Sequence, residues 1–116
     1  MRKIERAIID IIECRHDVRL SKRDRVICGV TIVAYYLWET PVAIVYPDKV
    51  IIQSGGYRTR TTKSRLNAIL YHFCKTGIYA KKGVWYIASN HGGYEQVGST
   101  QREFEEGMSI PRIKGY

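Results

Sequence analysis

The sequence predicts an α+β fold: an antiparallel β-sheet of about five or six strands with one helix packed across it and an N-terminal amphipathic helix. Three observations lead to this prediction. The 116 residues suit one domain, 1–116. Two stretches place apolar residues at helical spacing. Short runs rich in β-branched and aromatic residues lie between and after them, separated by turn signals.

Residues 1–15 are predicted to form the first helix. Their apolar side chains follow the i, i+3, i+4, i+7, i+8 spacing that lines one helical face: Ile4, Ala7, Ile8, Ile11 and Ile12. This isoleucine stripe suits packing on the chain's own sheet. Narrow stripes on terminal helices also form dimer contacts, so residues 1–15 are an alternative oligomerisation element and a homodimer is an open expectation.

The strands of the predicted meander begin after a charged segment. Residues 15–25 have no clear period and are predicted to be an exposed connection. Residues 26–36, 42–46 and 50–52 are dense in β-branched and aromatic residues, with turn signals between them. Consecutive antiparallel strands joined as hairpins are expected, and the α+β core is predicted to span 26–110.

The second helix is predicted over residues 62–76, with Thr61 or Thr62 as its N-cap and Gly77 closing it in a left-handed conformation. Its apolar face consists of Leu66, Ile69, Leu70 and Phe73. Further strands are predicted at 78–80, 84–88 and 94–97, with a turn at 90–93, and a last short strand at 108–110 should stop at Pro111. Trp85 and Tyr86, as neighbours on a strand, are expected to point to opposite faces.

The positive charge of the chain is concentrated in one segment. The formal net charge is +8, from 19 basic and 11 acidic residues. Residues 57–82 contain seven basic residues and no acidic one. Such an unbalanced block favours a polyanionic partner, namely nucleic acid or a nucleotide. A merely solubilising surface is the alternative explanation.

The segment GGYRTRTTKSRLN, residues 55–67, is the candidate binding site. Unpaired N–H groups at the start of a helix attract anions, and arginine can grip phosphate oxygens with two donors at once. A plain strand-to-helix corner, with a threonine that only caps, is the alternative, because neither G-x-x-x-x-G-K-[ST] nor G-x-G-x-x-G occurs. The candidate ligand-binding residues are Tyr57, Arg58, Arg60, Thr61, Thr62, Lys63, Arg65, Asn67 and Tyr71.

The sequence favours a binding protein over an enzyme. It contains no G-x-S-x-G or H-E-x-x-H pattern, and the Cys–His pairs have i, i+2 spacing unsuited to chelation on a helix, so no catalytic residue, metal or cofactor is expected. No apolar run reaches the roughly 20 residues that span a bilayer, so no membrane partner is expected. Three cysteines without a C-x-x-C pair indicate a reducing compartment, and a cytoplasmic protein is expected.

Three segments, GGYRTRTTKSRLNAIL, KKGVWYI and FEEGMSI, resemble a family of small proteins from bacteriophages and other mobile elements. That family carries a G-G-[WY]-x-T-x-T-T-K-x-R-[LM]-N block, then a G-x-W-[YF] strand and an F-x-x-G-[ML] segment. The similarity covers residues 40–110, with Tyr57 where tryptophan is usual. The matching residues are Gly55, Gly56, Tyr57, Thr59, Thr61, Thr62, Lys63, Arg65, Asn67 and Trp85. The resemblance implies a phage protein in the cytoplasm of an infected host cell and specifies no activity.

Two hypotheses from different classes follow. In the first, the protein is a non-enzymatic binder of phosphate-bearing ligands, nucleic acid or nucleotide, through the basic segment. In the second, it is a phage interference protein that inhibits a host protein by direct contact, in anti-defence or host takeover.

Overall fold

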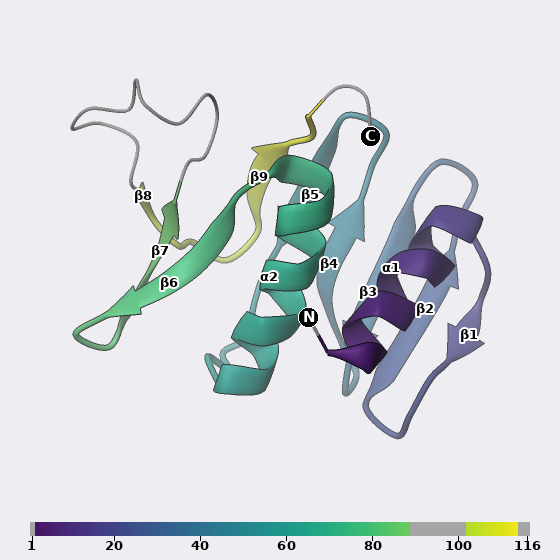
Figure 1. Ribbon diagram of the computed structural model, residues 1–116, viewed down its shortest axis with the longest axis horizontal. Coiled ribbons are helices and arrows are strands. Elements are labelled where there is room, and N and C mark those ends of the chain that lie inside the picture. Colours follow the sequence, from purple (N-terminus) through teal and green to yellow (C-terminus); the bar gives the residue numbers. More distant parts are fainter. Residues whose placement is uncertain (1, 89–101, 114–116) are drawn as a thin grey trace.

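The structure of the protein is a computed structural model, which describes residues 2–88 and 102–113 (Figure 1). The α+β prediction is confirmed, with two sheets in place of one. The two helices are α1 (Lys3–Cys14) and α2 (Arg60–Cys74). The larger sheet consists of β1 (Val18–Arg19), β2 (Asp24–Cys28), β3 (Val33–Leu37), β4 (Thr40–Val45), β5 (Lys49–Ile52) and β9 (Met108–Pro111). The smaller sheet consists of β6 (Gly77–Lys81), β7 (Val84–Ala88) and β8 (Arg102–Glu103).

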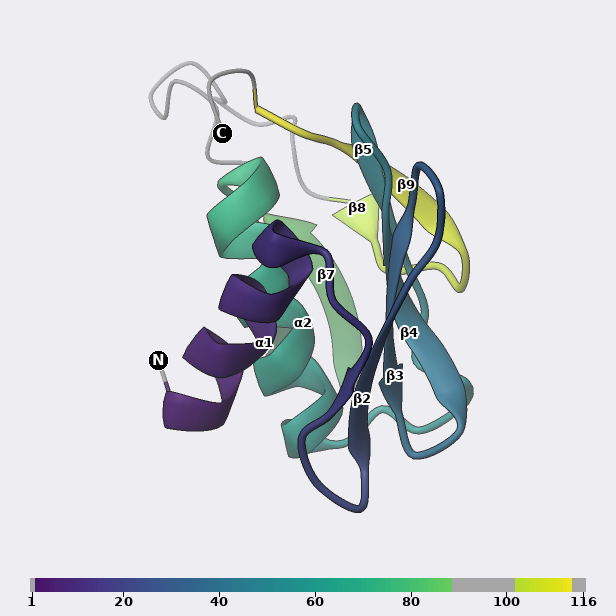
Figure 2. The same ribbon diagram turned by 90° about the vertical axis from the view of Figure 1, so that its right-hand side faces the viewer.

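Both helices cover the same face of the six-stranded sheet (Figures 1 and 2). The strands alternate buried and partly exposed residues, as β3 does from Val33 to Leu37, because successive side chains point to opposite faces. The buried side of the sheet packs with Leu66, Ile69 and Phe73 of α2 in one hydrophobic core. The fold is therefore two layers, helices on sheet, with β6 and β7 beside α2.

The isoleucine stripe of α1 faces the rest of its own chain. Ile8, Ile9 and Ile12 are buried, Ile4 and Ile11 are partly buried, and α1 contacts α2, β2 and β3. The predicted helix is confirmed. The stripe packs within its own chain, and a homodimer through α1 stays a prediction.

The predicted meander from β2 to β5 is confirmed, and every neighbouring pair of strands in the six-stranded sheet is antiparallel. The last strand, β9, returns from the C-terminal region to pair with β5, with Ile52 opposite Met108. Trp85 is buried while Tyr86 is partly exposed, as their positions on β7 predict. The turn predicted at 90–93 and the strand predicted at 94–97 lie outside the described residues.

Three details of the sequence-based prediction were wrong. The segment 15–25 is not only an exposed connection, because it contains β1 and the fully buried Asp24. The N-cap of α2 is Thr59, whose side chain accepts a hydrogen bond from the backbone N–H of Thr62 at 3.2 Å. The left-handed C-cap is Lys75, with φ 55°, while Gly77 already belongs to β6.

Candidate functional site

The turn that leads into α2 is fixed by two glycines and one carboxylate. Gly55 and Gly56 have φ of +66° and +87°, in the left-handed region that glycine adopts without strain. Glu106 accepts hydrogen bonds from the backbone N–H groups of Ser54, at 2.6 Å, and Gly55, at 3.2 Å, and from the Ser54 hydroxyl. Burial alone would raise the pKa of Glu106, but these bonds and the charge of Arg58 outweigh it and lower that pKa.

Arg58 has partners in its own chain and does not line the groove described below. Its guanidinium lies 3.6 Å from the Glu106 carboxylate and 5.0 Å from the centre of the Phe104 ring. Trp85 is also under it, at 5.8 Å. Arg58 therefore helps to fasten the turn to the β7–β9 region, and a phosphate would have to compete with Glu106 for it.

Arg65 is buried, which corrects its prediction as a residue that contacts a ligand. Its guanidinium is 2% exposed and hydrogen-bonds to Asp24 Oδ1 and to Glu5 Oε2, both at 3.0 Å. Asp24 also accepts from the hydroxyls of Tyr35 and Ser21. Burial alone would raise the pKa of Asp24, but these hydrogen bonds and the Arg65 charge outweigh it and lower that pKa. This network joins α1, α2, β2 and β3 and leaves Arg65 unavailable to a ligand.

Four of the predicted residues line a groove beside the first turns of the two helices. The structure brings them together with residues of α1, and the groove has a volume of about 470 Å³. We call it the basic groove; its lining residues are Arg2, Glu5, Arg60, Lys63, Ser64, Asn67, Ala68 and Tyr71. Arg60 and Tyr71 are exposed, and Lys63 is partly exposed.

The electrostatics of the basic groove are one-sided. Its only acidic lining residue, Glu5, is buried, bonded to Arg65 and the Ser64 hydroxyl. Within residues 2–88 and 102–113, neither Arg60 nor Lys63 forms an ion pair. The first turns of α1 and α2, where the helix dipoles are positive, both border the groove. The groove therefore presents uncompensated positive charge beside an exposed tyrosine.

Asn67 has a structural task in this groove. Its amide donates to the carbonyl of Ile78 at 3.0 Å, and its side-chain oxygen accepts from the Ile78 N–H at 2.5 Å. Both polar atoms are used to fasten β6 to α2. Lys63, Asn67 and Tyr71 follow one another along α2 at four-residue spacing, but the amide of Asn67 is occupied.

The remaining predicted residues line a second hollow, on the other side of the first turn of α2. It has a volume of about 550 Å³. We call it the aromatic pocket; its lining residues are Arg23, Leu37, Trp38, Glu39, Thr40, Tyr57, Thr59, Thr61 and Thr62. Thr62 is buried and its hydroxyl lies 3.0 Å from that of Thr59. Tyr57 is exposed, as is Trp38.

Sequence reasoning missed Arg2 and Trp38 as members of these two surfaces. Arg2 joins the groove only because α1 and α2 lie side by side with their N-terminal ends together (Figure 1). Trp38 stands directly before the turn signal at residues 39–41. An aromatic residue at the tip of a predicted hairpin could have indicated an exposed ring.

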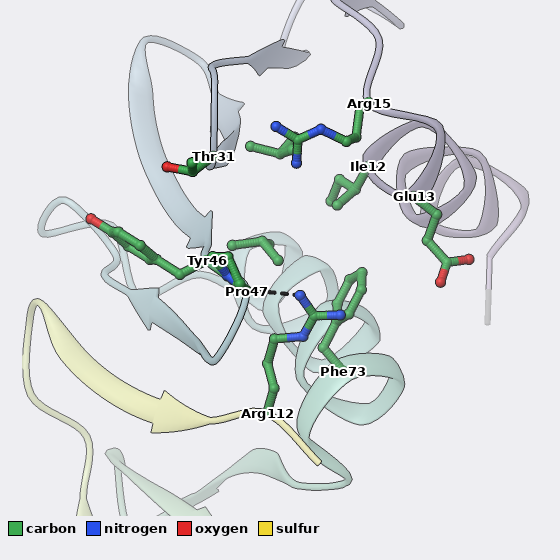
Figure 3. Close-up of a pocket in the computed structure, with 10 residues that line it drawn as sticks. Ile12, Glu13, Arg15, Thr31, Tyr46, Pro47, Phe73 and Arg112 are labelled. Atoms are coloured by element: carbon green, nitrogen blue, oxygen red, sulfur yellow. Dashed lines mark hydrogen bonds between the residues drawn. The ribbon is translucent and has the colours of Figure 1, made fainter. Parts of the chain in front are cut away.

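A third hollow lies at the opposite ends of the helices and has a volume of about 310 Å³ (Figure 3). Two arginines border it. Arg15 donates to the carbonyls of Gly29 and Val30, each at 2.9 Å, and Arg112 donates to the carbonyl of Tyr46 at 2.9 Å. Both guanidiniums thus tie loops to the helical layer, and none of the predicted site residues is here.

In the part of the chain that the structure describes, no group of three or more histidines, cysteines, aspartates or glutamates could hold a metal ion. Neither of the helices there is long and apolar enough to cross a membrane.

Comparison with known proteins places the chain among phage proteins. Neither the curated proteins nor the solved structures include a match to it. The model of one protein family, described as Kyanoviridae Gp96 protein, matches residues 1–111, so the match includes α1 as well as the basic segment. The chain therefore belongs to the Kyanoviridae Gp96 protein family, a family of phage proteins.

Proposed function

We propose that this phage protein is a non-enzymatic binder of nucleic acid that holds the phosphate backbone in the basic groove. The observation that carries the proposal is the convergence of Arg2, Arg60 and Lys63 from two helices on one groove. A solvated helix face would need no such convergence. Several cations gathered along one concave surface suit a polyanion such as a polynucleotide.

The state of the neighbouring carboxylates supports this proposal. A phosphate entering the groove would meet Glu5, but this carboxylate is 3% exposed and already bonded to the buried Arg65, which it shares with Asp24. Arg60 and Lys63 are not balanced in this way within the part of the chain that the structure describes. Phosphate binding there would add charge-assisted hydrogen bonds without first breaking an ion pair.

Tyr71 offers a second type of contact. Tyr71 is 57% exposed at the border of the groove. It lies about one helical turn after Asn67 and two turns after Lys63, on the same face of α2. An aromatic face beside phosphate-binding cations suits the sugar and base parts of a nucleic acid. Lys75 lies over this ring, 4.9 Å from its centre, and adds positive charge.

The test is fluorescence anisotropy with labelled oligonucleotides and the variant Arg60→Gln/Lys63→Gln. Two lost phosphate contacts should weaken binding roughly 25- to 60-fold at about 0.1 M salt, because each contact releases most of one counterion. The matched control is Lys81→Gln/Lys82→Gln, which removes the same charge from the exposed turn between β6 and β7 and should bind like the wild type. Equal losses in both variants would mean a diffuse charge effect and would contradict the assignment of the groove.

A further inference from the structure

The aromatic pocket contains two large rings that the fold does not use. Trp38 is 60% exposed and Tyr57 is 67% exposed, whereas the only other tryptophan, Trp85, is 5% exposed in the core. Both exposed rings border the same hollow. They come from different parts of the chain, Trp38 from the hairpin between β3 and β4 and Tyr57 from the segment before α2.

The backbone at Trp38 is unfavourable for a tryptophan. Its φ is +58°, in the left-handed region where a residue with a Cβ atom is strained and where glycine or asparagine is the usual choice. Its N–H donates to the carbonyl of Arg23 at 2.6 Å, which holds the hairpin tip against the residue directly before β2. A bulky aromatic residue kept exposed on a strained turn has no explanation in the packing, and strain of this kind is concentrated at functional sites.

The polar groups around the two rings suit a nucleobase. The Thr61 hydroxyl can donate, as can the half-exposed Arg23, whose Nε lies 3.8 Å from Asp24, and the exposed Glu39 carboxylate can accept from an exocyclic amine. Glu39 is only loosely held, 3.7 Å from Arg25. The hollow has a volume of about 550 Å³, enough for one base with its sugar.

The basic groove and the aromatic pocket lie on two sides of the same helical turn. Arg60 and Lys63 line the groove, and their neighbours Thr61 and Thr62 line the pocket. The two surfaces therefore share the first turn of α2, and a single strand that crosses this turn would reach both. Paired bases in a duplex are stacked inside the helix and cannot enter such a pocket, whereas the bases of a single strand can.

We infer that the ligand is single-stranded nucleic acid, and that one of its unpaired bases stacks on Trp38 and Tyr57 while its phosphates lie in the basic groove. This inference rests on the proposed function, and it adds the kind of strand and the base-binding residues. In this inference, Trp38 at the hairpin tip is the residue that makes the protein bind single strands in preference to duplexes.

Tryptophan fluorescence tests the inference directly, because stacking of a base on an exposed indole quenches its emission. The titrant is an oligonucleotide of about 12 nucleotides, within the range that such surfaces cover. We expect quenching by the single strand and little by the matching duplex. In Trp38→Phe, which leaves Trp85 as the only indole, we expect the quenching to disappear.

Affinity measurements on variants complete the test. Trp38→Ala should weaken single-strand binding by about 5- to 150-fold, the measured range for loss of one base stack, and Trp38→Phe should restore most of it. Trp38→Gly suits the left-handed turn without strain, so a loss of affinity in that variant cannot be attributed to misfolding. The control is Tyr46→Ala, which removes an aromatic side chain just after β4, at the other end of that strand from Trp38. It should bind single strands like the wild type.

The outcomes separate this inference from the proposed function. If Trp38→Ala binds single strands within twofold of the wild type while Arg60→Gln/Lys63→Gln does not, the base pocket is refuted and the groove stands. If a mononucleotide competes at concentrations similar to those of the oligonucleotide, the ligand is a free nucleotide and the single-strand inference is overturned. If the wild type binds no nucleic acid, both proposals fail and direct contact with a host protein becomes the explanation to pursue.

Discussion

Replacing Arg65 tests whether the buried network organises the helical layer. In Arg65→Met the side chain keeps much of its length, but Glu5 and Asp24 each lose a hydrogen bond of 3.0 Å from the guanidinium. Both carboxylates are buried, at 3% and 0% exposure, so water cannot replace the lost partner. Removal of one side of a buried ion pair typically costs about 3–5 kcal/mol. That would be a large share of the roughly 5–15 kcal/mol that stabilises a domain.

Urea denaturation, followed by far-ultraviolet circular dichroism, measures this loss as a fall in the free energy of unfolding. The control is Arg60→Met in the first turn of the same helix, where an exposed arginine forms no ion pair with any described residue; its effect should stay within about 0.5 kcal/mol. A loss below about 1 kcal/mol for Arg65→Met, with an unchanged m-value, would refute the reasoning. It would show that the two carboxylates are hydrated or protonated rather than held by Arg65.

Three further predictions concern the frame around the site. The pKa of Asp24 is lowered in the folded state, so its ionised carboxylate should contribute fully to stability above about pH 4, the pKa of an unfolded aspartate. This contribution should be lost as the pH falls further. Acid titrations of the free energy of unfolding should show this loss in the wild type and not in Asp24→Asn. Gly55→Ala should lower the free energy of unfolding by about 1–3 kcal/mol in thermal unfolding, since its φ is +66° and the new Cβ would lie 2.6 Å from Thr40 Cγ2. Gly56→Ala, whose new Cβ would have nothing within 4 Å, should lower it less, and equal losses would contradict the clash. Asn67→Ala should lower the free energy of unfolding by about 1–3 kcal/mol, because it leaves the N–H and carbonyl of Ile78 in β6 without their side-chain partner. Amide hydrogen exchange in β6 should become faster, and unchanged exchange would show that other contacts hold β6 against α2.

Local sequence patterns were sufficient for most of the fold. The spacing of Ile8 and Ile12 predicted α1, and the β-branched runs predicted the meander from β2 to β5, because these elements are determined by residues close together in the sequence. The ends of α2 were harder. Several threonines in a row can each cap a helix, and Lys75 adopts the left-handed conformation that was expected of Gly77.

The candidate site was predictable only in part, since charge alone does not tell whether an arginine is buried. Arg65 resembles its neighbours in the basic segment, but its partners Glu5 and Asp24 are 60 and 41 residues away in the sequence. The pairing of α1 with α2 brings Arg2 to Arg60 and Lys63, and this too depends on tertiary packing. The candidate surface consequently excludes Arg65 and includes Arg2, which lies outside the basic segment.

If Arg60 and Lys63 in the basic groove bind phosphates, the salt dependence of nucleic-acid binding must depend on them. The slope of the logarithm of the binding constant against the logarithm of the salt concentration counts the phosphate contacts, at about 0.7 per contact on a single strand. We predict that the slope for Arg60→Gln/Lys63→Gln is about 1.4 smaller in magnitude than that of the wild type, while the slope for Lys81→Gln/Lys82→Gln is unchanged. Equal slopes for the wild type and Arg60→Gln/Lys63→Gln would show that these two cations contact no phosphate and would refute the proposed function of the groove.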